Sequence, residues 1–334
     1  MADYRQFDSI VLTVVFLTLV ESMTDDTPQR FTIDQVDQSL PLDQWKPRLA
    51  DYGRRRHLSY TLDFDTRVHT LEDPGMGWDE AARAMHLKNQ ELTRQRLGAE
   101  FGTDALDAKV QNFIDIGSKP FSVLAYHNRL FDEVRRAFVI GAYYPALVGA
   151  CALGERILNH LILDLRAQYS HTPEYKKVFR KDSFDDWRIV IDALEAWEML
   201  LPKAVSEFRA LMTLRHRSIH FNVSTYSTLR EDALTAILHM REIIDQQFTA
   251  FGLRPWFILG TKGHIFIKRE WEKNPFVKAY YLPTCPFVGP YFAISFTHGL
   301  RFHDHNDYGD GAWTDEGFAQ VFNDRTFERM PLTD

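Results

Sequence analysis

The sequence predicts a mainly α protein, in which an up-and-down helical bundle follows a helical N-terminal extension and precedes a small β-rich appendage. Two observations lead to this fold class. From Ser122 to residue 252, apolar side chains recur three and four positions apart, as on amphipathic helices. After residue 252 that period ends, and short runs of aromatic and β-branched residues alternate with glycines and prolines. The predicted domains are therefore 1–120, 121–252 and 253–334.

The first predicted domain, whose role the sequence does not indicate, contains two helices. Residues 79–101 form a charged helix that ends at Gly102, and Thr103 caps a shorter helix that runs through Ile116. Ahead of them lies a basic run, Arg54–His57. Such a charge run is more often a solvated face than a nucleic-acid site, so we expect these side chains at the surface.

Nothing in the sequence predicts secretion or a membrane partner. The apolar run at residues 10–20 is about half as long as a membrane-spanning helix, and it lacks a cationic flank and a small-residue cleavage site. We expect a buried helix or strand there; the alternative is that translation begins at Met23. The two cysteines, Cys151 and Cys285, are too few for a disulfide framework, which favours a cytoplasmic protein.

The bundle is predicted to contain five helices. Pro145 lies in the first turn of the second helix and Pro202 opens the fourth, where the missing N–H costs no hydrogen bond. Ser183 caps the third helix, and Ser227 opens the fifth. In chain order, the predicted helices are 122–140, 142–168, 184–200, 202–220 and 228–251.

The third predicted domain is built from strands. Residues 256–259 and 264–268 flank the glycine-containing turn Gly260–Gly263, which predicts a β-hairpin. Further strands are predicted at 276–282 and 288–296, and the remaining residues after 300 form an acidic tail.

The charge balance excludes two function classes. The 334 residues include 46 Asp or Glu and 39 Lys or Arg, for a net charge of −7, and 45% of them are hydrophobic. Such a chain has enough apolar side chains for a core and is not disordered. Net acidity also excludes a protein that coats nucleic-acid phosphates over its whole surface. A nucleic-acid contact is therefore expected at a local patch, and residues 252–300 are the basic segment.

The fourth predicted helix has a cation inside its apolar stripe. The helical period places Arg215 between Leu211 and Ile219, on the face that packs into the core. A charge on an apolar face must be paired or used, because burying it alone is costly. His216 and His220 are four residues apart, so they lie on one face of the same last turn.

The second predicted helix has a matching anion. Its apolar stripe passes through Glu155, on a helix expected to neighbour the one with Arg215. A buried carboxylate and a buried guanidinium on adjacent helices favour an ion pair. We therefore predict that Glu155 binds and orients Arg215, and that Arg217 supplies a further cation nearby.

Residues 122–252, about 40% of the chain, resemble a HEPN domain (higher eukaryotes and prokaryotes nucleotide-binding). The signature of that family is an Arg, a polar residue directly after it, and a His at the end of the penultimate helix. Arg215, His216 and His220 match it, with four residues between Arg215 and His220. The stretch GAYYPALVGACALGERIL also resembles the early helix of the family, with its acidic residue.

Two details define how far this resemblance extends. The same spacing recurs at Arg166 and His171, but Ala167 is not polar and the segment runs off a helix into a loop. Part of the family has a tyrosine two residues after the His, where this chain has Asn222, so regulation through that tyrosine is not expected.

The resemblance implies a metal-independent endoribonuclease that needs no cofactor. RNA would be cleaved by attack of its own 2′-hydroxyl, with His220 as general acid or base and Arg215 stabilising the phosphate charge. His216 would assist as a second proton donor or phosphate contact. The family also implies a homodimer that brings two motifs into one cleft, and a toxin or phage-defence effector controlled by an antitoxin or another regulatory protein.

The basic segment offers a second RNA contact. Lys262, Lys268, Arg269 and Lys273 are predicted to hold the RNA backbone, the alternative being an ordinary solvated hairpin. A different reading of the whole protein is a non-catalytic HEPN bundle that binds nucleotide, RNA or a protein partner.

Two histidine groups raise the alternative of a metal site. His216 and His220 at positions i and i+4 suit zinc, but no third ligand is evident and no general-base Glu lies between them. The run His303–Asp307 is the other candidate, and in an acidic, glycine-rich tail it is more often a solvated loop. No metal is therefore predicted.

Overall fold

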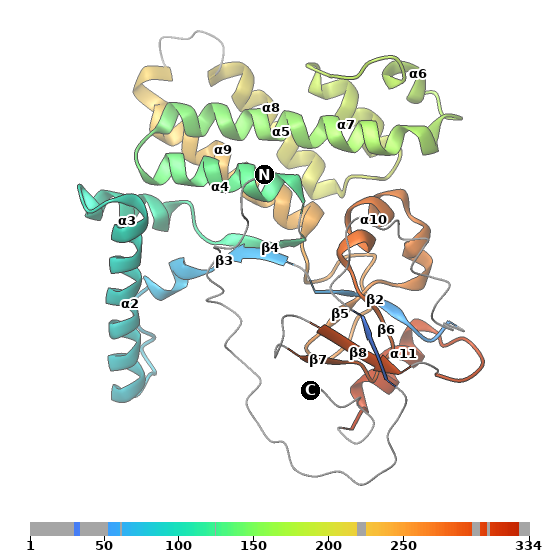
Figure 1. Ribbon diagram of the computed structural model, residues 1–334. Helices are drawn as coiled ribbons and strands as arrows, with labels where there is room; N and C mark the ends of the chain where they lie inside the picture. The colour runs from blue at the N-terminus through green and yellow to red at the C-terminus, as the bar shows by residue number, and fades with distance from the viewer. Residues whose placement is uncertain are drawn as a thin grey trace.

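The computed structural model describes residues 30–33, 53–60, 62–123, 125–218, 225–295, 301–305 and 308–326. About 60% of these residues are helical, including ten α-helices, and the strands form only small sheets. The fold is therefore mainly α, as predicted. In Figure 1 the helical bundle occupies the upper part of the view, and the small sheets and α11 lie below it.

The bundle is built around α5 (Tyr143–Leu165), against which α4, α7, α8 and α9 all pack (Figure 1). By length and composition alone, the helix Tyr143–Tyr169 could cross a membrane. Its side chains Leu147, Ile157 and Leu161 are, however, fully buried in the core of the bundle. The bounds of the other helices are α4 Tyr126–Val139, α6 Tyr175–Val178, α7 Trp187–Ala196, α8 Pro202–Ser218 and α9 Thr225–Phe248.

The first predicted helix of the bundle starts too early. Residues 122 and 123 lie in β4 (Lys119–Val123), which pairs antiparallel with β3 (Leu62–Asp65). Lys119 is buried, with its Nζ 2.6 Å from Asp132 Oδ1 and also in contact with Asp63. Because β3 is distant in sequence, the helical period at 122–140 gave no sign of this strand.

The third predicted helix also starts later than expected, because α7 begins at Trp187 and Ser183 does not cap it. Asn159 on α5 fixes the preceding loop: its Nδ2 donates to the Phe184 carbonyl at 3.0 Å, and its Oδ1 accepts from the Phe184 N–H at 2.7 Å. Asp186 then caps α7. A contact with α5 therefore decides where this helix begins.

The two predicted helices of the N-terminal domain are present as α2 (Glu80–Phe101) and α3 (Leu106–Asp115). Thr103 does not cap α3; the residue before it is Ala105, whose backbone is left-handed with φ 48°. Helix α2 projects away from the bundle (Figure 1) and packs against α3 and η2 (Arg67–Thr70).

The predicted hairpin around Gly260–Gly263 is present in a short form, with a backbone hydrogen bond of 2.8 Å from the Ile258 N–H to the Phe266 carbonyl. Its second arm contains β5, which pairs with β2 (Arg56–Ser59), and β2 also pairs with β6. A second sheet has the order β1-β8-β7. The remaining elements are β1 Arg30–Ile33, β5 Ile265–Phe266, β6 Phe287–Val288, β7 Ala293–Ser295, β8 Arg301–His305, α11 Asp315–Asn323, η3 Arg166–Tyr169, η4 Arg269–Lys273 and η5 Leu282–Thr284.

The prediction of a strand at 276–282 is wrong, because this segment forms α10 (Pro275–Tyr280) and the start of η5. Asn274 caps α10 by accepting from the N–H groups of Phe276 and Val277 at 3.0 and 3.1 Å. Pro275 suits the first helical turn. This capped start outweighs the β-favouring composition of the segment.

The basic run Arg54–His57 is not solvated as predicted, because Arg55 and Arg56 are fully buried. Arg55 Nε lies 3.2 Å from Asp304 Oδ2, and Arg56 Nε lies 2.6 Å from Asp315 Oδ1. Both carboxylates come from the predicted acidic tail. The described part of that tail is therefore folded, and β8 and α11 share a second hydrophobic core with β2.

Candidate functional site

Arg215 lies in the last turn of α8, and its Nη2 is 2.9 Å from Glu155 Oε2 on α5. The predicted ion pair is therefore confirmed. The two side chains are less buried than predicted, since Arg215 is 23% exposed and Glu155 is 32% exposed. Solvent thus reaches part of the Arg215 side chain while the carboxylate of Glu155 holds its guanidinium.

Trp187 on α7 contacts both members of this ion pair. Its indole Nε1 donates to Glu155 Oε2 at 3.2 Å, and the Arg215 guanidinium lies 5.5 Å from the centre of its ring. The close approach of α7 depends on Gly154, where an added Cβ would lie 2.7 Å from the Trp187 ring. Arg215 is therefore oriented by a carboxylate and an aromatic face on two different helices.

Cys151 lies one turn before Glu155 on α5 and is buried. Burial raises the pKa of its thiol to about 12, although the charge of the nearby Arg215 acts in the opposite direction. A thiol with this pKa stays protonated at neutral pH and is a poor nucleophile. Cys151 is therefore not expected to act as a nucleophile at this site.

Arg217, predicted as a further cation near Arg215, is 61% exposed and has a carboxylate partner on α9. Its Nη2 lies 2.6 Å from Asp232 Oδ1 on α9. Asp232 is 5% exposed and also accepts from the hydroxyls of Ser218 at 2.9 Å and Thr228 at 3.1 Å. These contacts join the end of α8 to the beginning of α9, across the segment that contains the predicted His220.

Sequence reasoning missed Asp232 as part of this region. It occurs in a charged run, Arg230-Glu231-Asp232, which is typical of a solvated helix face. A buried acid can be recognised there only once α8 and α9 are placed side by side. The sequence feature that could have indicated a buried acid is the pair of hydroxyl donors, Ser218 and Thr228, at the two helix ends that face each other.

Of the two predicted histidines, the structure describes His216 but not His220. His216 is exposed on the last turn of α8. His220 lies outside the described residues, as does Asn222, so the spacing between Arg215 and His220 in space stays a prediction. Within the ranges that the structure describes, no group of three or more His, Cys, Asp or Glu side chains is arranged to hold a metal.

The run His303–Asp307 was expected to be a solvated loop, but its described part is strand β8. Asp304 is fully buried and accepts from the Gly289 N–H at 2.8 Å as well as from Arg55. Burial raises the pKa of Asp304. His303 is also buried, with Nε2 3.0 Å from the Ser295 hydroxyl. These side chains stabilise the second core.

Of the predicted RNA-binding residues, Lys262 and Lys273 are exposed, and Lys268 and Arg269 are half-buried. Lys262 lies in the hairpin turn, where its N–H donates to Asn323 on α11 at 2.9 Å. Arg269 and Lys273 line one cavity together with Glu270 and Glu272. The acids between them cancel much of the positive charge that the sequence count indicated.

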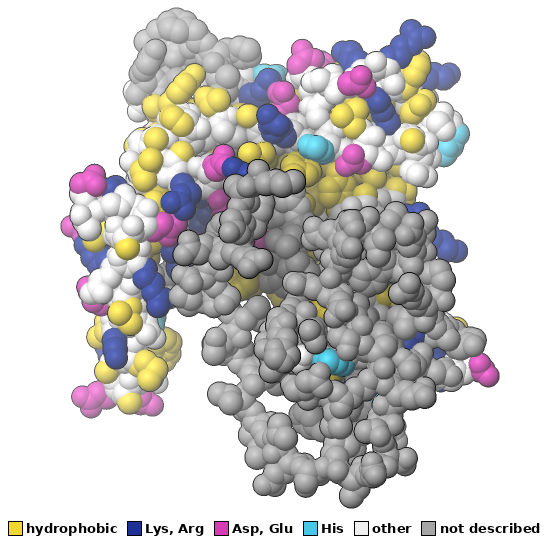
Figure 2. Space-filling view, viewed as in Figure 1, with side chains coloured by type: hydrophobic (Ala, Val, Ile, Leu, Met, Phe, Trp, Pro, Cys, Tyr) yellow, Lys and Arg dark blue, Asp and Glu magenta, His cyan; other side chains and the backbone are white. Residues whose placement is uncertain are grey.

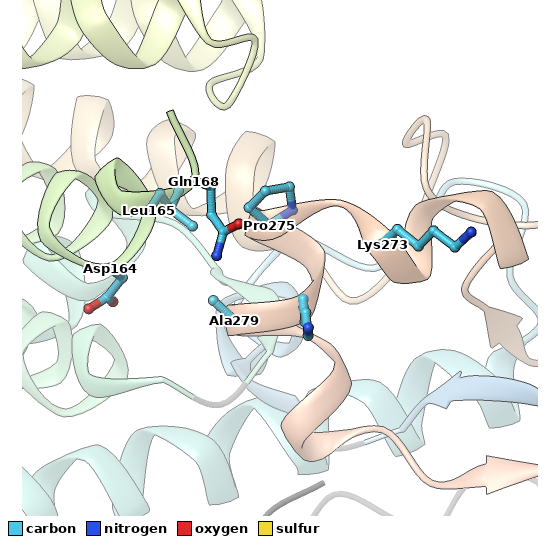
Figure 3. Close-up of a pocket in the computed structure, with 7 residues that line it drawn as sticks. Asp164, Leu165, Gln168, Lys273, Pro275 and Ala279 are labelled. Carbon is cyan, nitrogen blue, oxygen red and sulfur yellow. The ribbon is translucent and has the colours of Figure 1, made fainter. Parts of the chain in front are cut away.

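A second cavity, of about 220 Å³, lies between the end of α5 and α10 (Figure 3). Asp164, Gln168 and Lys273 are among its lining residues. Asp164 Oδ2 accepts from the Tyr280 hydroxyl at 2.7 Å, so this carboxylate joins the bundle to α10. The lining mixes one acid with two lysines, and it does not include Arg215.

No family model, curated protein or solved structure matches this chain in the comparisons made. The resemblance to HEPN domains therefore rests on the sequence motif at Arg215.

Proposed function

We propose that this protein is a metal-independent endoribonuclease of the HEPN type. The observation that carries the proposal is the environment of Arg215: Glu155 and Trp187 hold its guanidinium in place, while the side chain as a whole is partly exposed. A planar guanidinium fixed in this way is preorganised to bind phosphate oxygens and to stabilise charge as it develops.

The proposed reaction starts with the 2′-hydroxyl of the RNA. A base removes its proton, the oxygen attacks the adjacent phosphorus, and the bond from phosphorus to the 5′-oxygen breaks. The products are a 2′,3′-cyclic phosphate and a 5′-hydroxyl, whose proton comes from an acid. We assign proton transfer to His220, because histidine titrates near neutral pH, and a second donor role to the exposed His216.

One motif supplies one main histidine, whereas the reaction needs a base and an acid. We therefore propose a two-fold symmetric homodimer that brings both Arg215–His220 pairs into one cleft. The family resemblance further suggests a cytoplasmic toxin or phage-defence effector, held inactive by an antitoxin or another regulatory protein. Activity of a form that stays monomeric during the assay would contradict the dimer.

The test compares two histidines in one assay. RNA is incubated in EDTA with the wild type, with His220→Ala and with His171→Ala, whose exposed histidine belongs to the decoy spacing Arg166–His171. We expect cleavage by the wild type and by His171→Ala, and loss of cleavage by His220→Ala. Cleavage that requires metal, or that survives in His220→Ala, contradicts the proposal.

The second candidate function is a binding bundle without catalysis. It is favoured by one observation: Arg215 already has a carboxylate partner, as an arginine with a purely structural role would. In that case the wild type would bind RNA or nucleotide in the same assay and leave the RNA intact.

A further inference from the structure

The connection between α5 and α7 presents a group of cations that the sequence analysis did not single out. We call residues 175–181 the basic loop; it contains α6. Its four cations, Lys176, Lys177, Arg180 and Lys181, are all exposed. In Figure 2, Lys and Arg side chains gather over α6 at the upper right of the molecule. The loop is positive although the protein as a whole is acidic.

The basic loop is fixed on the bundle. Arg166, at the end of α5, donates to the carbonyls of Val178, at 2.7 Å, and of Lys181. Val178 is fully buried and anchors the loop from below. Arg166 Nη2 also lies 3.4 Å from Oδ1 of Asp182, an acid that directly follows the loop and is 94% exposed. The four exposed cations thus stand on a rigid support.

Aromatic rings lie among these cations. Tyr175 and Phe179 stack with their ring centres 5.5 Å apart, and Phe179 is 39% exposed. The Arg180 guanidinium lies 5.0 Å from the centre of the Phe179 ring. Cations that follow a phosphate backbone, combined with exposed rings on which bases stack, are typical of surfaces that bind single-stranded nucleic acid.

The basic loop and Arg215 are supported by side chains of α5 and of η3, which follows α5 directly. Glu155 holds Arg215, Asn159 holds Phe184, and Arg166 holds the loop. Glu155 and Asn159 are four positions apart and therefore share one face of α5. From Glu155 to the end of α5 at Leu165, just before Arg166, the helix rises about 15 Å. The chain that leaves the loop also runs directly into Trp187, which contacts Arg215.

We propose that the basic loop binds the sugar–phosphate backbone of single-stranded RNA, next to the phosphate that Arg215 contacts. In this proposal one RNA strand contacts the loop and Arg215 together. This inference rests on the proposed nuclease function and adds to it the class of substrate, a single strand, and the surface that selects it. The contact through Lys262, Lys268, Arg269 and Lys273 stays a separate prediction.

Binding is tested with a fluorescent single-stranded RNA, measured by anisotropy at several salt concentrations. All proteins carry His220→Ala, so that RNA stays intact. The loop variant is Lys176→Gln, Lys177→Gln, Lys181→Gln. The matched control removes three exposed cations from α2: Arg83→Gln, Lys88→Gln, Arg96→Gln. Loss of three phosphate contacts lowers the slope of log affinity against log salt by about 2, and we expect this for the loop variant alone.

RNA cleavage gives an independent measurement, made with proteins that keep the native His220. With a long single-stranded RNA, the loop variant should raise KM and leave kcat near the wild-type value. With a dinucleotide, which is too short to reach the loop, neither constant should change. Loss of kcat on both substrates would mean that the loop supports the fold or the chemistry and does not bind the long strand. That result would overturn the proposal.

The two proposals fail in different ways. If the wild type cleaves RNA but the loop and control variants bind it equally, the proposed role of the basic loop is contradicted and the proposed nuclease function is retained. If binding depends on the loop but nothing is cleaved, the nuclease is wrong and the RNA surface stands. Binding of the loop to anionic phosphatidylserine vesicles, without binding to RNA, overturns the loop proposal in favour of a membrane surface.

Discussion

At the scale of single residues, the last turn of α8 contains two arginines with different partners. Arg215 is bound by Glu155 and Trp187 and stays partly open to solvent. Arg217 is turned toward α9 and pairs with Asp232. The sequence indicated the first partner, because both Glu155 and Arg215 interrupt apolar stripes. It did not indicate the second, because Asp232 lies in a run of charged residues.

Arg215→Ala should lower the rate of RNA cleavage by about 10²–10³-fold, the usual cost of removing one preorganised donor to a developing negative charge. Stability should change by about 1 kcal/mol or less, because the pair with Glu155 is partly exposed. The matched control is Arg209→Ala on the same helix, whose guanidinium pairs with Asp192 and Glu195. Equal losses of activity in both variants would contradict a special role for Arg215.

His127 on α4 should make stability depend on pH. Burial, together with the charge of Lys119, lowers the pKa of His127 to about 3. The unfolded chain, with an ordinary pKa of about 6.5, then binds the proton that the folded state excludes. Stability is therefore lost as pH falls below that value, by about 2 kcal/mol between pH 7 and pH 5. Urea unfolding of His127→Gln should lack this decrease; an unchanged pH dependence would refute the assignment.

At the scale of elements, helix content was predictable and strand pairing was not. The period of apolar residues revealed α5 and α8, because a helix is stabilised by contacts close in sequence. β2 and β4 escaped detection, because their partners β6 and β3 are far away along the chain. The start of α7 was misplaced for the same reason, since Asn159 on another helix fixes the loop before it.

The junction between α8 and α9 depends on Asp232. Asp232→Ala leaves the Ser218 hydroxyl without its buried acceptor and Arg217 without its partner, which should cost about 1–3 kcal/mol. Amide hydrogen exchange should accelerate at the end of α8 and the beginning of α9. Glu231→Ala, an exposed neighbour, provides the control. Exchange that is unchanged in Asp232→Ala would show that the junction is held by other contacts.

At the scale of the whole molecule, buried ion pairs join a segment near the beginning of the chain to a segment near its end. Residues 53–60 contribute β2 and the buried Arg55 and Arg56, and the acids that pair with them come from β8 and the start of α11. The sequence indicated a solvated basic run and an acidic tail, because each segment alone has an unbalanced charge. Their complementarity appears only when the two segments meet.

Asp304→Ala should destabilise the second core by about 3–5 kcal/mol, because it leaves the Arg55 guanidinium buried without its carboxylate. Thermal unfolding of the full chain measures this. Asp310→Ala is the control, because the Asp310 side chain is exposed and its contact with Arg54 uses the backbone carbonyl. A fall in Tm of equal size in both variants would mean that the buried pair has no special weight.

The central claim is that the Arg215 motif cleaves RNA through the 2′-hydroxyl without a metal. The most direct test treats an RNA and the DNA of the same sequence with the wild type in EDTA and identifies the new ends. The predicted result is cleavage of the RNA alone, with 2′,3′-cyclic phosphate and 5′-hydroxyl ends. Intact RNA, cleavage of the DNA, or 5′-phosphate ends that appear only when metal is added would contradict the claim.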